Sequence, residues 1–174
     1  MITRCNISDA IDLSEQQAPY VLTTAGNDPK EDNDCGVVAL ALAADIDYAS
    51  AHELLRLCVG RQNKAPTLSM WSACRFLPLK IRQMNKKRFR LSTLPNRYPK
   101  GRYYVQIGGR DIKSRFGIDG KHHCHAMALI DGKIYDRHIN PPSRWVTGVW
   151  RIEGLKADSW WGWKAKELPA RFRP

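Results

Sequence analysis

A run of nine apolar residues, GVVALALAA at positions 36–44, most constrains how this chain can fold. The acidic stretch NDPKEDND, residues 27–34, comes before this run and is followed directly by Cys35. Asn33 and Asp34 are suited to accept hydrogen bonds from the free N–H groups of a first helical turn. Because the run is apolar all round rather than along one stripe, we expect a helix that begins near Asp34 and is buried on most sides. Cys35 then lies in the first turn of a buried helix.

The segments after this run change from helical to strand patterns. YASAHELLRLC, residues 48–58, and TLSMWSACRFL, residues 67–77, predict two further helices. The later runs are short, β-prone and bounded by Gly, Asp or Pro: PLKIRQM, GRYYVQI, HAMALI, KIYDRHI and RWVTGVWRI. Helices followed by strands predict an α+β fold, in which N-terminal helices pack on a C-terminal antiparallel sheet.

A single domain accounts for most of the chain. Its 174 residues, 43% of them hydrophobic, suffice for one substantial core but hardly for two. We expect an irregular lead-in over residues 1–30, with room for one short helix, and one domain over residues 31–174 with a basic, tryptophan-rich tail from about residue 143. No apolar run approaches the roughly 20 residues that span a bilayer, and the first residues lack the apolar core of a secretory signal. We therefore expect a soluble, cytoplasmic protein with no membrane partner.

The cysteines do not form a recognisable framework. Cys5, Cys35, Cys58, Cys74 and Cys124 are an odd number, widely spaced, and contain no CxxC pair. This pattern indicates neither a disulfide scaffold nor a zinc ribbon, so we expect reduced thiols and no cofactor.

Charge is distributed very unevenly. Residues 1–53 hold ten acidic and two basic side chains, residues 54–110 hold no acid, and the whole chain has a net charge of +11. A basic patch within the acid-free part consists of Lys86, Lys87, Arg88 and Arg90. Such a patch attracts nucleic acid or an acidic protein, and the alternative is a solvated cationic face.

A histidine and an aspartate are predicted to meet on a hairpin. In HHCHAMALIDGKIYDRHINP, residues 122–141, the Asp-Gly pair at 131–132 separates two β-prone runs and predicts a two-residue turn. With that register, side-chain alternation places His125, Asp136 and His138 on one face. Asp136 is then the diagonal neighbour of His125, so its carboxylate can accept the Nδ1–H of the ring and hold it. A three-residue turn would move Asp136 to the other face.

Cys35 and this histidine have the chemistry of a nucleophilic site. The thiolate is the reactive form of cysteine, and both the positive end of a helix and a neighbouring imidazolium lower the pKa of a thiol from its usual value of about 8.5. Cys35 at the start of a helix and His125 backed by Asp136 fit this chemistry, with the backbone N–H of Cys35 as an oxyanion donor. The simpler alternative is that Cys35 is a small core residue and the other two are ordinary strand residues.

Five motifs along the chain resemble a known enzyme family. NDCGVVALALA, DYASAHELL, TLSMWSACRFL, LSTLPNRYPKGRYYVQIGG and HAMALIDGKIYDRHINP together resemble a small papain-like cysteine peptidase of the bacteriocin-leader-processing type, and bacteriophages encode short proteins of similar layout. The resemblance covers roughly residues 30–142. It implies a papain-like fold and a triad of Cys35, His125 and Asp136 that cleaves a peptide or isopeptide bond. For a phage-encoded protein it implies a host or phage protein as substrate and the host cytoplasm as location, with the virion as the alternative.

The sequence departs from that family at two places. The family carries a glutamine shortly before the cysteine that completes the oxyanion hole, and residues 26–34 contain none, so that Asn27 or Asn33 are the substitutes at hand. The basic segment GRDIKSRFGIDGKHHC, residues 109–124, looks like an insertion beside the site. Deamidation, acyl transfer and a loss of catalysis therefore stay open, and the basic patch would steer an acidic substrate.

Three other interpretations compete with the peptidase. In one of them, the HHCH cluster binds a metal ion through His123 and His125, with Cys35 or Asp136 as a further ligand. Adjacent residues of a strand point to opposite faces, so that only His123 and His125 of this cluster could share a site, and we therefore predict no metal site. A nucleic-acid-binding protein would use the basic patch and the tail SWWGWKAKELPARFRP. A non-catalytic binder of a host factor would keep the peptidase-like scaffold without its chemistry.

Overall fold

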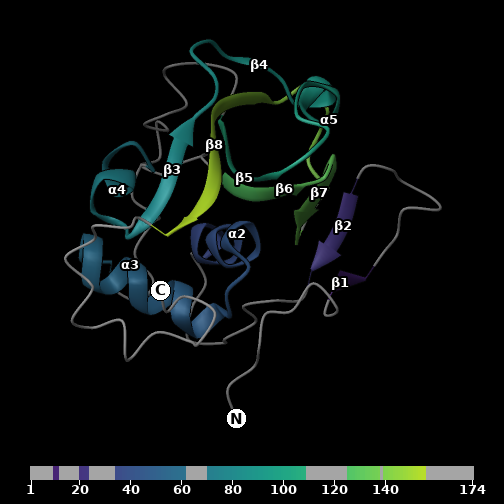
Figure 1. The fold of residues 1–174 in the computed structure, drawn as a ribbon. Helices are drawn as coiled ribbons and strands as arrows, with labels where there is room; N and C mark the ends of the chain where they lie inside the picture. Colours follow the sequence, from purple (N-terminus) through teal and green to yellow (C-terminus); the bar gives the residue numbers. More distant parts are fainter. Residues whose placement is uncertain are drawn as a thin grey trace, which may run out of the picture.

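The computed structural model describes residues 10–11, 20–23, 34–61, 70–108, 125–137 and 139–155, in which helices lie against a curved sheet (Figure 1). The helices are α2 (Cys35–Ala44), α3 (Tyr48–Val59), α4 (Met70–Phe76) and α5 (Leu94–Arg97), and the 3-10 turn η2 (Leu91–Thr93) precedes α5. The strands are β1 (Ala10–Ile11), β2 (Tyr20–Thr23), β3 (Leu79–Gln83), β4 (Phe89–Arg90), β5 (Arg102–Gly108), β6 (His125–Ile130), β7 (Lys133–Asp136) and β8 (Trp145–Leu155). The predicted α+β class is confirmed.

The described strands form one sheet in the order β1-β2-β7-β6-β5-β8-β3, with β4 paired to β8 outside this path. The C-terminal strands are all antiparallel to one another, as predicted. The lead-in differs from the prediction of an irregular segment over residues 1–30, because β1 and β2 extend the sheet and β2 runs parallel to β7. Strands of two and four residues are too short to show a clear alternation in the sequence.

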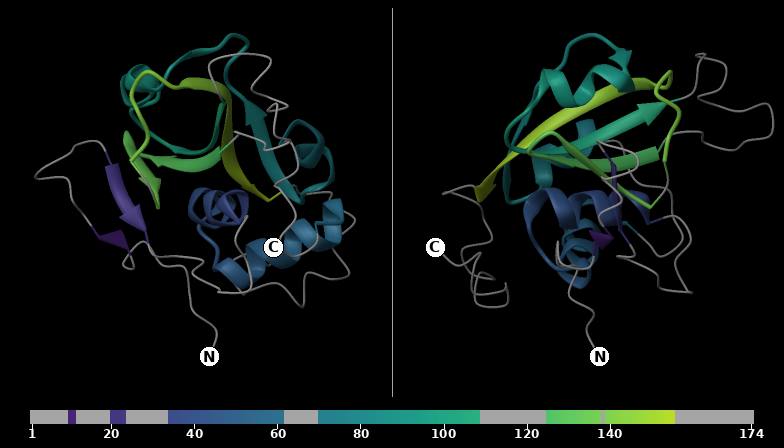
Figure 2. Two further views of the ribbon diagram at one scale, coloured as in Figure 1. Left: turned by 180° about the vertical axis from the view of Figure 1, so that it is seen from behind. Right: turned by 90° about the vertical axis from the view of Figure 1, so that its right-hand side faces the viewer.

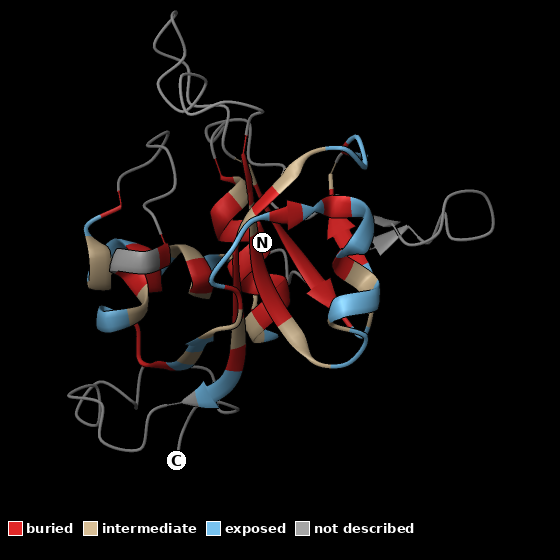
Figure 3. Cartoon of the chain, turned by 90° about the horizontal axis from the view of Figure 1, so that it is seen from above, coloured by how far each residue is buried: buried red, intermediate tan, exposed pale blue. Residues whose placement is uncertain are grey.

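Helices α2 and α3 lie on one side of the sheet and α5 lies on the other (Figure 2), and each side has its own core. Along β6, Ala126 and Ala128 pack against the helices, whereas Met127 and Leu129 belong to the other face, together with residues of η2 and α5. The first core contains the apolar run of α2, which is buried from Gly36 to Ala43 and lies in the buried centre of the molecule (Figure 3). The expectation of a helix buried on most sides is confirmed.

A bulge in β8 lies near the start of β6. Gln106 pairs with Gly148 but Ile107 pairs with Val146, so that Thr147 is an extra residue in β8. Bulges increase the local twist of a strand pair and re-aim the residues beside them. Ile107 also pairs with His125, the first residue of β6, so the bulge lies one strand away from this histidine.

Arg102, the first residue of β5, links the C-terminus of α2 to the sheet through hydrogen bonds and an ion pair. Its guanidinium donates to the carbonyl oxygens of Leu42 at 2.9 Å and Ala43 at 3.3 Å, and pairs with Asp45 at 2.9 Å. A cation at the negative end of a helix satisfies carbonyls that have no partner within the helix. Within the described residues, no helix is both long and apolar enough to cross a membrane.

Candidate active site

Three chain segments bring the predicted triad together. Cys35 is the first residue of α2, His125 the first of β6 and Asp136 the last of β7. The hairpin between β6 and β7 has the predicted register, with Leu129 opposite Ile134. Its turn residues Asp131 and Gly132 have positive φ angles of 47° and 79°, as expected for a two-residue turn. The start of β6 and the end of β7 therefore lie beside each other.

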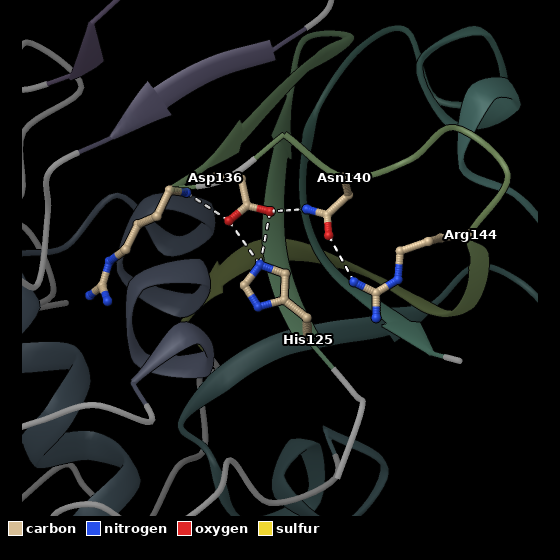
Figure 4. Close-up of polar contacts among 5 residues, drawn as sticks. His125, Asp136, Asn140 and Arg144 are labelled. Carbon is tan, nitrogen blue, oxygen red and sulfur yellow. Dashed lines mark hydrogen bonds and ion pairs between the residues drawn. The ribbon is translucent and has the colours of Figure 1, made fainter. Parts of the chain in front are cut away.

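His125 and Asp136 are in direct contact (Figure 4). Nε2 of the imidazole lies 2.8 Å from Oδ1 and 2.8 Å from Oδ2 of the carboxylate. We predicted the same partner but the other ring nitrogen, Nδ1, and that detail was wrong. Strand alternation determines on which face a side chain lies but not how its ring is turned about its own bonds.

Cys35 contacts the same imidazole. Its side chain is hydrogen bonded to His125 and is only partly exposed, at the edge of the helix-facing core. Because Nε2 is bound to Asp136, Nδ1 is the ring nitrogen that remains for the thiol. His125 thus lies between an acid and a thiol, which is the order of groups that nucleophilic catalysis by cysteine requires.

The surroundings of His125 favour its charged form. Burial alone would lower its pKa, but the hydrogen bonds with Asp136 and Cys35, together with the charge interactions with the same two groups, outweigh burial and raise the pKa from 6.5 to about 9. An imidazolium at neutral pH stabilises a neighbouring thiolate. The pair can therefore exist as thiolate and imidazolium before a substrate binds.

Asp136 is held in place by donors that the sequence did not reveal. The carboxylate is buried; its Oδ1 accepts the backbone N–H of Arg137 at 2.7 Å and its Oδ2 accepts Nδ2 of Asn140 at 2.7 Å. Arg144 donates to Oδ1 of Asn140 at 2.9 Å, which orients the amide (Figure 4). Asn140 lies in the loop after β7 and precedes a proline, a pattern that is typical of turns. Nothing in this pattern indicates the contact between Asn140 and Asp136.

Of the two residues predicted to cap α2, Asn33 lies outside the described residues and Asp34 does not cap the helix. It occupies the position before the first helical residue, but its side chain makes no capping hydrogen bond. Its Oδ2 instead accepts from Tyr48 at 3.0 Å and from Nη2 of Arg137 at 2.6 Å. The prediction failed because an arginine far along the chain competes for the carboxylate, and a charged donor outweighs a backbone N–H.

Several other predicted site residues lie in chain segments other than those that carry the triad, or lie outside the described residues. Asn27 and Asn33, the predicted oxyanion donors, and His123 and His138 are outside the described residues. Of the basic patch, Lys86, Lys87 and Arg88 are exposed between β3 and β4. Arg90 is exposed too, but it donates to the carbonyl of Ser143 at 2.6 Å and lies 3.9 Å from the ring centre of Trp145. Among the described residues, no group of three or more His, Cys, Asp or Glu side chains is arranged to hold a metal ion.

Comparisons with protein-family models, with curated proteins and with solved structures found no match for this chain.

Proposed function

We propose that this protein is a cysteine hydrolase that cleaves a peptide or isopeptide bond, with Cys35 as nucleophile, His125 as general acid and base, and Asp136 as the group that orients the imidazole. The observation that carries the proposal is the position of one imidazole between a buried carboxylate and a thiol. A histidine with a purely structural role does not require that its second ring nitrogen be hydrogen bonded to a thiol at the N-terminus of a helix. A papain-like relationship is part of the proposal, since its motifs are those that supply these three residues.

The reaction follows from the positions of these groups. The thiolate of Cys35 attacks the carbonyl carbon of the substrate, and the C=O electron pair moves onto oxygen. This oxyanion forms at the N-terminus of α2, where the positive end of the helix dipole stabilises negative charge. Nδ1 of His125 gives its proton to the leaving amine as the C–N bond breaks, and a thioester remains.

Water completes the cycle. Nδ1, now without its proton, accepts one from water as the water oxygen attacks the thioester carbon. The C–S bond breaks, a carboxylic acid is released, and the thiolate and imidazolium form again. Asp136 accepts a hydrogen bond from Nε2 throughout and stabilises the charged ring. With ammonia as the leaving group the same site would be a deamidase. With an amine in place of water as the acceptor of the acyl group it would be an acyltransferase.

We infer a protein or peptide substrate and a reducing compartment such as the cytoplasm, where the thiol of Cys35 would stay reduced. An acidic substrate would be attracted by the exposed side chains of Lys86, Lys87 and Arg88. A substrate-trapping variant, Cys35→Ala, keeps His125 and Asp136 and would retain a bound substrate for identification by mass spectrometry.

The rate of alkylation of Cys35 by iodoacetamide tests the proposal without a known substrate. The rate is followed by mass spectrometry from about pH 4 to about pH 9, with the other cysteines of the same molecule as internal controls. We expect Cys35 to react well below pH 7 and ahead of the others. His125→Ala should remove this advantage, and Asp136→Ala should reduce it. If Cys35 reacts only near pH 8.5, or not at all, in all three proteins, it is a core cysteine and the proposal is wrong.

A further inference from the structure

The residue before the nucleophile carries a charge that the triad does not use. The Asp34 side chain has no exposed surface. One oxygen, Oδ2, accepts from Tyr48 and Arg137. The other, Oδ1, is buried and has no hydrogen-bond partner among the described residues. A buried carboxylate that is only half satisfied depends strongly on its one cation, because removing that partner leaves an uncompensated charge.

Arg137 joins the two halves of the site. Its backbone N–H donates to Oδ1 of Asp136 at 2.7 Å, and its guanidinium donates to Oδ2 of Asp34 at 2.6 Å. One residue therefore contacts both the acid of the triad and the residue next to the nucleophile. These contacts link the end of β7 to the start of α2. Asp34 and Arg137 are 103 positions apart in the sequence.

The negative charge of Asp34 would oppose the formation of a thiolate at Cys35 if it were not neutralised. A carboxylate next in sequence to Cys35 disfavours a thiolate and a developing oxyanion, since like charges repel strongly where water is excluded. The side chain of Arg137 is itself 22% exposed, so most of its surface is also withdrawn from water. Its ion pair with Asp34 is screened less than an ion pair in solution.

We propose that Arg137 is a positioning residue for Cys35: it neutralises the buried carboxylate of Asp34 and holds the start of α2 against the end of β7. This inference rests on the proposed function, because it assigns Arg137 a role in keeping the nucleophile as a thiolate. Arg137 does not touch the reacting atoms; it acts through Asp34 and Asp136.

Other charged and titratable groups near the site remain unchanged in the test. Among the described residues, His125 on β6 and Tyr104 on β5 interact with Cys35, Asp136 on β7 contacts His125, Tyr48 on α3 contacts Asp34, and Arg61 after α3 acts on Tyr104. Burial raises the pKa of Tyr104 well above 10, so Tyr104 stays neutral over the pH range of the experiment. A difference between variants in that range is therefore due to the pair that is mutated.

Two single variants that break the same ion pair separate a charge effect from a loss of structure. Arg137→Ala leaves the negative charge of Asp34 beside Cys35 and should raise the pH midpoint of Cys35 alkylation by about one unit. Asp34→Asn leaves the positive charge of Arg137 and should not raise the midpoint. The double variant should return the midpoint to within a few tenths of a unit of the wild type, and Arg137→Lys should lie between Arg137→Ala and the wild type.

Arg102→Ala is the matched control for loosening of α2. Arg102 fastens the other end of the same helix, through Leu42, Ala43 and Asp45, and lies away from Cys35 in the sequence of the helix. We expect this variant to lower the melting temperature without moving the alkylation midpoint. Circular dichroism confirms the fold of each variant, and the near-isosteric Asp34→Asn keeps the test valid if Arg137→Ala does not fold.

The outcomes separate this inference from the proposed function. If wild-type Cys35 reacts early and Arg137→Ala and Asp34→Asn shift the midpoint in the same direction, or not at all, the inference is overturned while the hydrolase proposal stands. If wild-type Cys35 does not react early, the proposed function fails and this inference fails with it. A raised midpoint in Arg137→Ala that is absent from Asp34→Asn and is reversed in the double variant would support the role of Arg137.

Discussion

His125 couples the chemistry of the site to the stability of the protein. Its imidazole is largely buried and is bonded to two groups that favour its charged form. A histidine that is more basic in the folded than in the unfolded chain stabilises the fold only while it is protonated. The groups that would activate Cys35 in the proposed reaction therefore also affect how the stability depends on pH.

The free energy of unfolding should fall as the pH rises from about 6.5 to about 9. The folded pKa of His125 is raised to about 9, above its unfolded value of 6.5, so its contribution is complete below pH 6.5 and is lost as the pH passes 9. Urea unfolding at about pH 6, below the unfolded pKa of His125, and at about pH 9.5, above its folded pKa, measures the loss of stability. His125→Gln should lose much less stability over this range.

Cys35→Ala provides a graded control for the same measurement. It removes one of the two groups that raise the pKa of His125 and leaves Asp136, so its pH dependence should lie between those of the wild type and His125→Gln. Identical pH dependence in the wild type and His125→Gln would show that the folded pKa of His125 is not raised.

The sequence allowed a prediction of the pair of His125 and Asp136 because its main determinant is local. The Asp-Gly turn between β6 and β7 determines the register, and the register brings His125 to Asp136. The contact of Arg137 with Asp34 was not predictable in the same way, since it depends on how α2 packs against a distant strand. Asn140 was missed for a related reason: a loop residue of this type commonly supports a turn, and its contact with Asp136 depends on the path of the loop.

Helix α2 and strand β8 show how single elements position the site. The apolar run of α2 predicts its burial, but an arginine contact near each end determines where it lies on the sheet. In β8, Gly148 follows the bulge and leaves space for Trp150, whose indole is buried and meets Tyr104 edge to face at 6.0 Å between ring centres. This aromatic pair belongs to the core beneath α2.

Gly148→Ala should destabilise the fold by about 1–3 kcal/mol, because overpacking of a core costs energy of this order. A Cβ at position 148 would lie 2.0 Å from Cη2 and 2.2 Å from Cζ3 of Trp150, and the indole is too buried to move aside easily. Thermal unfolding should show a fall in Tm of roughly 2–12 °C. Adding Trp150→Phe, which shortens the ring system, should cost less in the Gly148→Ala background than in the wild type. Additive costs in the double variant, or an unchanged Tm in Gly148→Ala, would contradict the steric explanation.

The molecule as a whole carries its charge asymmetrically. The net charge is +11, and the acid-free part of the sequence, residues 54–110, includes all of β3, β4 and β5. On β3, Lys80 and Arg82 are exposed, and Arg82 lies directly opposite Arg151 of β8. Like charges in opposed positions destabilise a sheet unless an anion compensates them. The basic patch after β3 continues this exposed positive surface.

This surface should bind nucleic acid with a salt dependence that the basic patch determines. We expect the affinity for a short DNA duplex to fall steeply between roughly 50 and 200 mM salt, because each phosphate contact releases condensed counterions. Lys86→Gln with Lys87→Gln should reduce the slope of log affinity against log salt by about 2, if both lysines contact phosphates. Lys100→Gln with Lys133→Gln removes the same charge from the opposite end of β8, next to the turn between β6 and β7, and should leave the slope nearly unchanged. Equal slopes for the two double variants would mean that only the total charge matters, and an affinity that does not change with salt would exclude a nucleic-acid surface. Steep binding together with an unreactive Cys35 would favour a basic binding protein on this scaffold over a hydrolase.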